Sequence, residues 1–258
     1  MILAFPHHDP EGRYNEVFAR NLSTLKGIFS RVVASVTYPT YKQNRAFIDT
    51  LLSKEIVVHK NNRDSNIGDH FRNALSTSTR NVQDQELIFF SFIDRVLYML
   101  EGQNKQEFID DLKMAESGKL TIFERSGKAW NTHPKNYRDM EQFINKLFLK
   151  LSGKNIEMNF CAMTLDRTAA ENILSNSITN DWAITGEWVL LSLKKSLPLV
   201  TKKVDWLDWE DPFWTNENKY QLKKRLENDP KETIKRIKSN IPFLNLMLED
   251  RFLKLNNT

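Results

Sequence analysis

Asp94 is the residue whose position in the sequence most clearly suggests chemistry. It follows seven mostly apolar residues at 87–93, Leu-Ile-Phe-Phe-Ser-Phe-Ile, and apolar residues with helical spacing come after it at 96–100. An apolar run rich in Phe and Ile is typical of a strand that is covered on both faces. We therefore predict that a buried strand brings Asp94 to its carboxyl end, where open α/β sheets bind ligands. The alternative is that Asp94 only caps the following helix, with Arg95 in solvent.

Further polar side chains follow other predicted strands. They lie at 7–13, at a helix start near Asp69 and Arg72, at 125–133 and at 181–188. A carboxylate there could hold a divalent ion on a diphosphate, and an arginine could neutralise a leaving group. A second carboxylate could act on an acceptor hydroxyl, and a tryptophan could stack on a base or a sugar. This set suits a sugar-nucleotide enzyme, although the tryptophans could equally be core or interface residues.

Several other chemistries lack their motifs. The eight glycines are not spaced as in a Rossmann fingerprint or a phosphate loop, and no serine stands in a Gly-x-Ser-x-Gly elbow. The five histidines include no i, i+4 pair with a neighbouring glutamate, which excludes a helical zinc hydrolase site. The one cysteine, Cys161, lies in an apolar stretch, where an inert thiol is expected.

Length and composition indicate one large domain. A chain of 258 residues can bury a sufficient core, and a single cysteine allows neither an internal disulfide nor a cysteine-based zinc site. The first residues have no basic region and only a short apolar run, unlike a signal peptide, and no apolar stretch has the length of a membrane span. We therefore expect a cytoplasmic protein without a transmembrane segment.

Strands and helices alternate along the first half of the sequence. This order predicts right-handed crossovers and a mostly parallel α/β sheet. Expected strands are 1–5, 31–37, 56–59, 87–93, 119–123, 156–162 and 197–204, and expected helices include 16–29, 42–52, 105–115, 137–151 and 168–174. We expect a long polar loop at 124–134, which at that length is more often functional than not.

The sequence beyond residue 214 predicts two or three helices, divided at Pro230 and Pro242. We therefore divide the chain into a domain at 1–214 and a helical C-terminal tail at 215–258. The net charge of +4 lies in this tail. Nucleic-acid binding is nevertheless not expected, because acidic residues at 227–232 interrupt the basic ones.

As a set, several segments resemble a bacterial family of glycosyltransferases with the GT-A fold, related to mannosylglycerate-synthase-like enzymes. The matching pieces are His-Asp-Pro-Glu-Gly-Arg at 8–13, Ile-Asp-Arg-Val-Leu at 93–97 and Arg-Ser-Gly-Lys-Ala-Trp-Asn-Thr-His-Pro at 125–134. Asp-Arg-Thr-Ala-Ala at 166–170 and Asp-Trp-Ala-Ile-Thr-Gly-Glu-Trp at 181–188 fit as well. The resemblance covers about residues 1–214 and leaves the tail outside.

The resemblance implies a GT-A-like fold and a nucleotide-diphospho-sugar transferase. It makes Asp94 the last carboxylate of a metal-binding Asp-x-Asp motif for Mg²⁺ or Mn²⁺, and it places Asp181 or Glu187 near the acceptor as catalytic residues. Candidates for binding the nucleotide-diphosphate sugar are Glu11, Arg13, Arg72, Arg125 and His133.

One departure from the family pattern concerns the metal. Phe92 stands where the Asp-x-Asp motif has its first carboxylate. One carboxylate and the diphosphate oxygens can still hold a hydrated ion, with lower affinity. We predict a glycosyltransferase that moves a hexose from a nucleoside-diphosphate sugar to an acceptor hydroxyl. The alternative is a non-catalytic binding or scaffold protein of the same fold, in which exposed tryptophans and the tail form a homo-oligomer interface.

Overall fold

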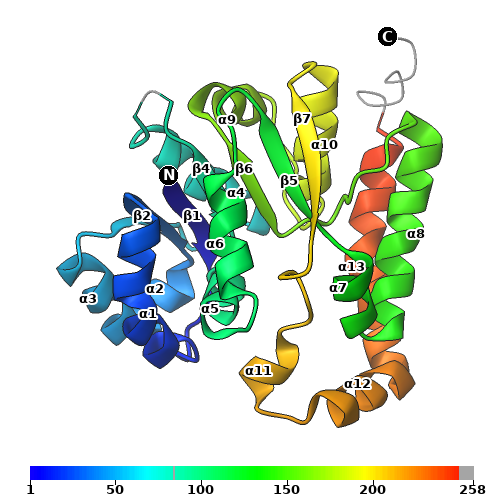
Figure 1. Cartoon of the computed structure of the whole chain (residues 1–258), viewed down its shortest axis with the longest axis horizontal. Coiled ribbons are helices and arrows are strands. Elements are labelled where there is room, and N and C mark those ends of the chain that lie inside the picture. Colours follow the sequence, from blue (N-terminus) through cyan, green and yellow to red (C-terminus); the bar gives the residue numbers. More distant parts are fainter. Residues whose placement is uncertain (84, 250–258) are drawn as a thin grey trace.

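One mixed seven-stranded sheet organises the residues that the computed structural model describes, 1–83 and 85–249 (Figure 1). Its strands are β1 (Ile2–His7), β2 (Arg31–Val36), β3 (Val57–Lys60), β4 (Ile88–Ser91), β5 (Leu120–Arg125), β6 (Ala162–Leu165) and β7 (Leu199–Val204). They lie in the order β3-β2-β1-β4-β6-β5-β7. β6 pairs antiparallel with β4 and β5, and the other described pairings are parallel. The predicted mostly parallel α/β sheet is confirmed.

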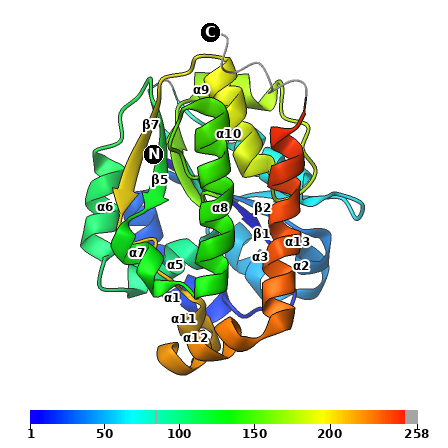
Figure 2. The same cartoon turned by 90° about the vertical axis from the view of Figure 1, so that its right-hand side faces the viewer.

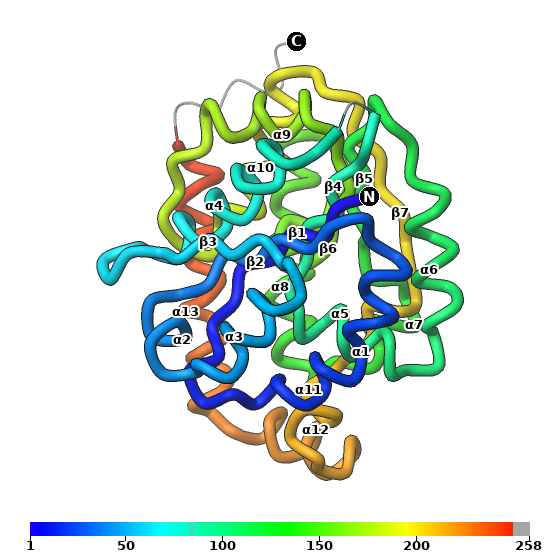
Figure 3. Tube along the Cα trace, turned by 90° about the vertical axis from the view of Figure 1, so that its left-hand side faces the viewer, coloured from blue at the N-terminus to red at the C-terminus, as the bar shows by residue number. Residues whose placement is uncertain are grey.

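Crossover helices cover both faces of the first four strands. Successive side chains of β1 point to opposite faces, so that Ile2 and Ala4 join one hydrophobic cluster and Leu3 and Phe5 the other. Figure 3 shows β1, β2 and β3 side by side, with a helix packed along β1 and β2. The helices of this half are α1 (Asn15–Ile28), α2 (Tyr38–Gln43), α3 (Arg45–Ser53), α4 (Ile67–Thr79) and α5 (Ile93–Glu101), and α4 is the one along β1 and β2.

The second half supplies the remaining helices. They are α6 (Lys105–Lys113), α7 (Gly127–Thr132), α8 (Lys135–Ser152), α9 (Arg167–Leu174), α10 (Ile184–Lys194), α11 (Asp211–Thr215), α12 (Lys219–Asn228) and α13 (Pro230–Met247). α13 lies beside α8 (Figure 2), and its Phe243 and Leu246 enter the same hydrophobic cluster as Phe148 of α8. The division of the chain at residue 214 stays a prediction. None of the described helices is both long and apolar enough to cross a membrane.

The expected loop at 124–134 is wrong, because this segment contains the end of β5 and all of α7. Glu124 and Arg125 remain in the strand, since they pair with Lys203 and Val204 of β7. Both are also bonded to Glu157. The Glu157 N–H donates to Glu124 Oε1 at 2.8 Å, and the Arg125 N–H donates to Glu157 Oε2 at 2.9 Å. Ser126 then caps α7 by accepting from the Ala129 N–H at 3.1 Å.

Three other boundaries differ from expectation. Residues 156–160 form no strand, although Ile156, Met158 and Phe160 are buried, and β6 begins only at 162. The expected helix at 42–52 is two helices, because Asn44 ends α2 and caps α3. Pro242 lies inside α13 and does not end it. An alternation of apolar and polar residues and single prolines were therefore insufficient to fix these boundaries.

Candidate active site

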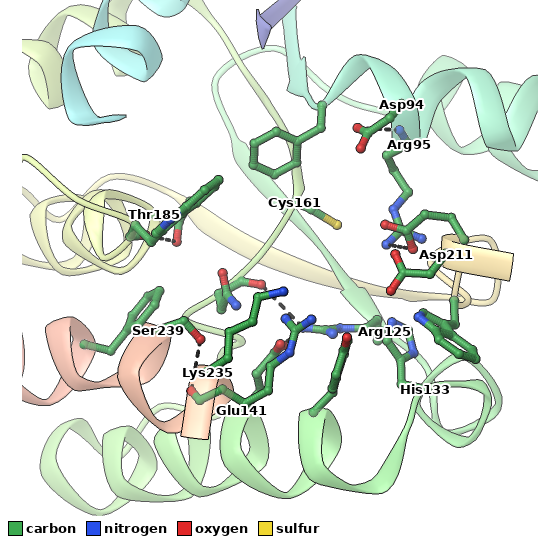
Figure 4. A pocket seen from close by; sticks show the side chains of 18 residues that line it. Asp94, Arg95, Arg125, His133, Glu141, Cys161, Thr185, Asp211, Lys235 and Ser239 are labelled. Carbon is green, nitrogen blue, oxygen red and sulfur yellow. Dashed lines mark hydrogen bonds and ion pairs between the residues drawn. The ribbon is translucent and has the colours of Figure 1, made fainter. Parts of the chain in front are cut away.

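Two cavities open at the carboxyl ends of the parallel strands. One, of about 470 Å³, we call the histidine cavity, because His7, His8 and His70 line it. The other, of about 370 Å³, we call the charged cavity; Figure 4 shows its acidic and basic side chains pointing into a shared space. Both cavities are lined by Phe92, Asp94 and Trp182. The two spaces therefore adjoin at the end of β4.

Asp94 lies where β4 gives way to α5. Phe92 is the N-cap residue of α5, and Asp94 stands in the first turn, where the free N–H groups favour a negative charge. The alternative that Asp94 is itself the N-cap is therefore wrong. Its Oδ1 accepts from the Arg95 N–H at 2.8 Å. Burial raises the pKa of the Asp94 carboxyl, and the nearby charge of Asp211 raises it further.

Asp94 belongs to a cluster of three carboxylates around one arginine. The Arg95 guanidinium forms an ion pair with Glu210 and donates to the Asp208 carbonyl. Asp94 and Asp211 make no ion pair within the described residues. Burial, chiefly, raises the pKa of Glu210 to about 7, against the opposing effect of Arg95. With all three carboxylates ionised, the cluster has two negative charges in excess.

The segment after β7 places Glu210 and Asp211 in this cluster. Two tryptophans fix its path. Trp206 is fully buried and its Nε1–H donates to Asp111 Oδ2 at 2.8 Å. The Trp209 N–H donates to Thr132 Oγ1 at 2.8 Å, which ties the segment to α7. Because β7 is parallel to β5, its carboxyl end delivers this segment to the same edge of the sheet as Asp94.

Arg125 forms a buried ion-pair network in the wall of the charged cavity. Its guanidinium is bonded to Glu141 of α8 and to Glu157, with Nε donating to Glu157 Oε1 at 2.7 Å. It also lies 3.7 Å from the ring centre of Trp130. Nearby, His133 is buried, its Nδ1 is 3.0 Å from the Ala129 carbonyl oxygen, and burial holds its pKa well below the usual value. His133 is therefore neutral at physiological pH.

α13 supplies another wall of the charged cavity, through Lys235 and Ser239 (Figure 4). Arg236 of the same helix also lines the cavity. Arg236 lies 3.2 Å from the ring centre of Tyr137, and its Nε donates to Glu232 Oε1 at 2.8 Å. The helical tail therefore contributes directly to the candidate site, although the sequence resemblance leaves it outside.

The histidine cavity is largely apolar. The His7 Nε2 atom is buried without a hydrogen-bond partner among the described residues, and burial lowers the pKa of His7 to about 4. His8 Nδ1 lies 3.0 Å from Thr37 Oγ1. Burial also lowers the pKa of His70. A buried nitrogen without a hydrogen-bond partner is costly, which marks His7 as an unusual residue in the wall of this aromatic pocket.

Trp182 and Phe92 together line both cavities, at the place where the two cavities adjoin. The Trp182 side chain is 46% exposed, and its position depends on the segment that precedes it in the sequence. Arg72 of α4 donates to the Thr179 carbonyl at 2.6 Å and to Asn180 Oδ1 at 3.1 Å. The buried Glu187 carboxylate accepts from Ser177 Oγ at 2.5 Å and from the Ile178 N–H at 2.9 Å. These contacts fix the backbone at 177–180.

Gly68 allows this segment to lie close to α4. A Cβ atom at position 68 would stand 2.0 Å from the Thr179 carbonyl oxygen. Gly68→Ala is therefore expected to destabilise the fold by about 1–3 kcal/mol or more, measured by urea unfolding, and to displace Trp182. Gly27→Ala is the matched control, because Gly27 is also helical and has no atom within 4 Å of the added Cβ. Equal stabilities of the two variants would contradict this packing argument.

The structure brings three of the predicted site residues together. Asp94, Arg125 and His133 line the charged cavity. The other five do not line either cavity. Glu11 and Arg13 form an exposed pair, the Asp181 carboxylate accepts from the Ala183 N–H at 2.9 Å, and Arg72 and Glu187 support the segment at 177–180. Their predicted roles stay predictions.

Glu210, Asp211 and the lining residues of α13 were missed by sequence reasoning. One signal in the sequence could have found Glu210 and Asp211. They belong to a polar segment that directly follows the last predicted strand, just as the other candidate polar loops directly follow earlier strands. Its two tryptophans and four carboxylates, Asp-Trp-Leu-Asp-Trp-Glu-Asp at 205–211, are consistent with a buried segment that presents charge. No local pattern indicated that α13 returns to the same edge.

Sequence comparisons identify no relative: no protein-family model matches the chain, and no curated protein matches it. Similar folds occur among solved structures. The crystal structure of glucosyl-3-phosphoglycerate synthase from Mycobacterium tuberculosis, in complex with Mn²⁺, uridine diphosphate and phosphoglyceric acid, has a TM-score of 0.50 and 10% identity. The match covers 78% of this chain and 66% of that one, so this chain spans just under two thirds of the enzyme's length.

Two further structures are similar at 10% identity, each over 78% of this chain. A mycobacterial protein has a TM-score of 0.49 over 64% of its chain, and another structure of the M. tuberculosis synthase has 0.47 over 68%. At this identity the likeness concerns the fold. The chain has the GT-A-like α/β fold of nucleotide-diphospho-sugar transferases, as the sequence resemblance predicts.

Proposed function

We propose that this protein transfers a hexose from a nucleoside-diphosphate sugar to an acceptor hydroxyl. The observation that carries the proposal is the position of Asp94, which lies at the carboxyl end of β4 and lines both cavities. A donor would place its nucleoside in the histidine cavity and its sugar at the junction, so that the diphosphate passes Asp94. The acceptor would then enter from the charged cavity.

The histidine cavity suits a nucleoside in size and chemistry. Tyr14 and Trp182 provide aromatic faces for a base or ribose, and the unpaired Nε2 of His7 provides a hydrogen-bonding atom. The similar synthase was crystallised with uridine diphosphate, which supports a nucleotide ligand for a fold of this kind.

Asp94 and Asp211 would hold a divalent cation. Within the described residues no group of three or more acidic, histidine or cysteine side chains could hold a metal ion. Two carboxylates nevertheless fit Mg²⁺ or Mn²⁺, because such ions keep several waters and bind substrate phosphates. When bound, the cation would neutralise charge on the diphosphate leaving group.

Glu210 is the side chain that we propose as general base. It lines the charged cavity, and a pKa of about 7 allows it to accept a proton from an acceptor hydroxyl near neutral pH. Glu187, the sequence-based candidate, is fully buried and hydrogen-bonded to the segment at 177–179. Arg95 keeps Glu210 in place and favours its ionised form.

Glu210→Gln is expected to lower the transfer rate about 100-fold while nucleotide binding is unchanged. In the unmodified protein the rate should rise with pH up to about 7, as Glu210 loses its proton, and then level off. The variant should lack this dependence. Rates measured between pH 5 and 9 test the assignment, with Glu171→Gln as an exposed control in α9. An unchanged pH profile in Glu210→Gln would assign the proton transfer to another group.

A second function is favoured by Phe92. Its ring centre lies 5.5 Å from that of Phe71, and the sequence resemblance implies that Phe92 stands where the Asp-x-Asp motif has its first carboxylate. Weaker cation binding would leave a protein that binds a nucleotide sugar without turnover. Sugar release from bound donor distinguishes the two functions, because only the transferase consumes the donor.

The proposed function is tested by thermal unfolding of the whole protein with uridine and guanosine diphosphates and their sugar conjugates, with and without Mn²⁺. At a ligand concentration of 100 Kd, binding stabilises a native protein by about 2.7 kcal/mol, or roughly 5–10 °C in a chain of this size. We expect a shift that requires both nucleotide and cation. No shift with any of these ligands, in folded protein, would rule out the proposed function.

A further inference from the structure

We propose that the charged cavity accepts an uncharged, polyhydroxylated acceptor and discriminates against carboxylates and phosphates. This inference rests on the proposed function and names its acceptor class. It contrasts with the phosphoglyceric acid present in the similar synthase.

The two buried arginines of the cavity are already neutralised by the protein. Arg125 is 7% exposed and is bonded to both Glu141 and Glu157. Arg95 is 8% exposed and is paired with Glu210. An anionic acceptor would have to displace one of these carboxylates and leave it buried without a partner, which is strongly unfavourable.

The two cationic side chains of α13 are also paired with a carboxylate of the protein. Arg236 and Lys235 both pair with Glu232, at 2.8 Å and 3.6 Å. Lys235 is 69% exposed, so its charge is screened by solvent at the edge of the cavity. A screened charge at the edge cannot offset the desolvation of a carboxylate or phosphate deeper in the cavity.

The charges of the cavity therefore balance without an anionic ligand. Four cations of the wall face four glutamates, namely Arg95, Arg125, Lys235 and Arg236 against Glu141, Glu157, Glu210 and Glu232. The two remaining acidic side chains, Asp94 and Asp211, are those assigned to a divalent cation. A further negative charge on the acceptor would meet only acidic groups and paired cations.

Neutral hydroxyl groups find suitable partners in the same space. Thr185 and Ser239 line the cavity, and each hydroxyl donates to a carbonyl oxygen, at 3.0 Å and 2.9 Å, so that its own oxygen can accept from a ligand. Phe92 and Trp182 offer apolar faces against which a sugar ring can pack. A polyol or sugar meets these requirements.

Matched ligand pairs test the inference on the whole protein loaded with Mg²⁺ and whichever nucleoside diphosphate binds. Saturation-transfer NMR would compare methyl glucoside with methyl glucuronide, and glycerol with glycerate and phosphoglycerate. We expect the neutral member of each pair to bind at least tenfold more tightly. Equal or tighter binding of the anions would overturn the inference, as would binding of neither class. Failure of the nucleotide itself to bind would instead refute the proposed function, and this inference with it.

Charge removal gives the complementary test. Glu141→Gln leaves Arg125 with one carboxylate, and Glu232→Gln leaves Arg236 and Lys235 without their ion-pair partner. Each folded variant should bind phosphoglycerate at least tenfold more tightly than the unmodified protein, whereas Glu171→Gln should not. A folded variant of either kind that gains no affinity for the anion would overturn the charge argument.

Discussion

Asp94→Asn is expected to abolish cation-dependent nucleotide binding and to lower the transfer rate about a thousandfold, equivalent to ~4 kcal/mol of transition-state stabilisation. The amide keeps the size of the side chain but removes the negative charge between the cavities. The fold should survive, because the lost carboxylate has no ion-pair partner among the described residues and burial raises its pKa. The unliganded variant should therefore unfold at the same temperature as the unmodified protein, or higher.

Thermal unfolding with nucleotide and Mn²⁺, beside a measurement of donor consumption, checks both parts of this prediction. Asp64→Asn is the matched control, because Asp64 is exposed in the loop between β3 and α4. A nucleotide shift of normal size in Asp94→Asn would remove Asp94 from the proposed site. A loss of stability without ligand would instead give Asp94 a structural role.

Arg125→Leu is expected to destabilise the protein by about 3–5 kcal/mol at pH 7, because it leaves Glu141 and Glu157 buried without their cation. The loss should depend on pH. Burial already raises the pKa of the Glu157 carboxyl, and Arg125 opposes this effect; without the arginine, the pKa of Glu157 in the folded state rises further above that in the unfolded chain. The folded state then binds more protons, so its stability falls as pH increases through this range. Urea unfolding at pH 5 and pH 8 should show the greater loss at pH 8.

Arg45→Leu provides the comparison, since Arg45 forms an exposed i, i+4 pair with Asp49 at 3.3 Å. Exposed pairs of this kind contribute about 0–1 kcal/mol. If the two arginine variants were equally stable at pH 8, the buried network would not contribute to the fold in the way that its geometry indicates.

The sequence predicted the central strand and its functional end because both are encoded locally. Seven mostly apolar residues before Asp94 are sufficient to identify a buried strand, although β4 ends at Ser91, two residues earlier than expected. The order of strands and helices likewise predicted the crossovers of the first half. Asp94, an acidic residue that lines both cavities, was thus singled out without knowledge of the contacts.

The remaining parts of the site depend on contacts between distant segments. Glu210 and Asp211 reach Asp94 only because β7 adds to the sheet beside β5. Glu187 has the sequence context of a site residue, yet its carboxylate is buried against the segment at 177–179. The same holds for residues 156–160, whose alternating apolar and polar residues resemble those of a strand, although Glu157 is buried and binds Arg125. In each case the position of the residue depends on contacts between segments that are distant in the sequence, and no local sequence pattern reports such contacts.

The position of α13 has a consequence for the order in which the two cavities form during synthesis. Apart from Trp182, the histidine cavity is built from residues 6–94, so most of its wall exists when little more than a third of the chain has been made. The charged cavity needs side chains up to Phe243 and cannot be complete before the last helix docks against α8. A growing chain would thus assemble most of the histidine cavity well before the charged cavity could be complete.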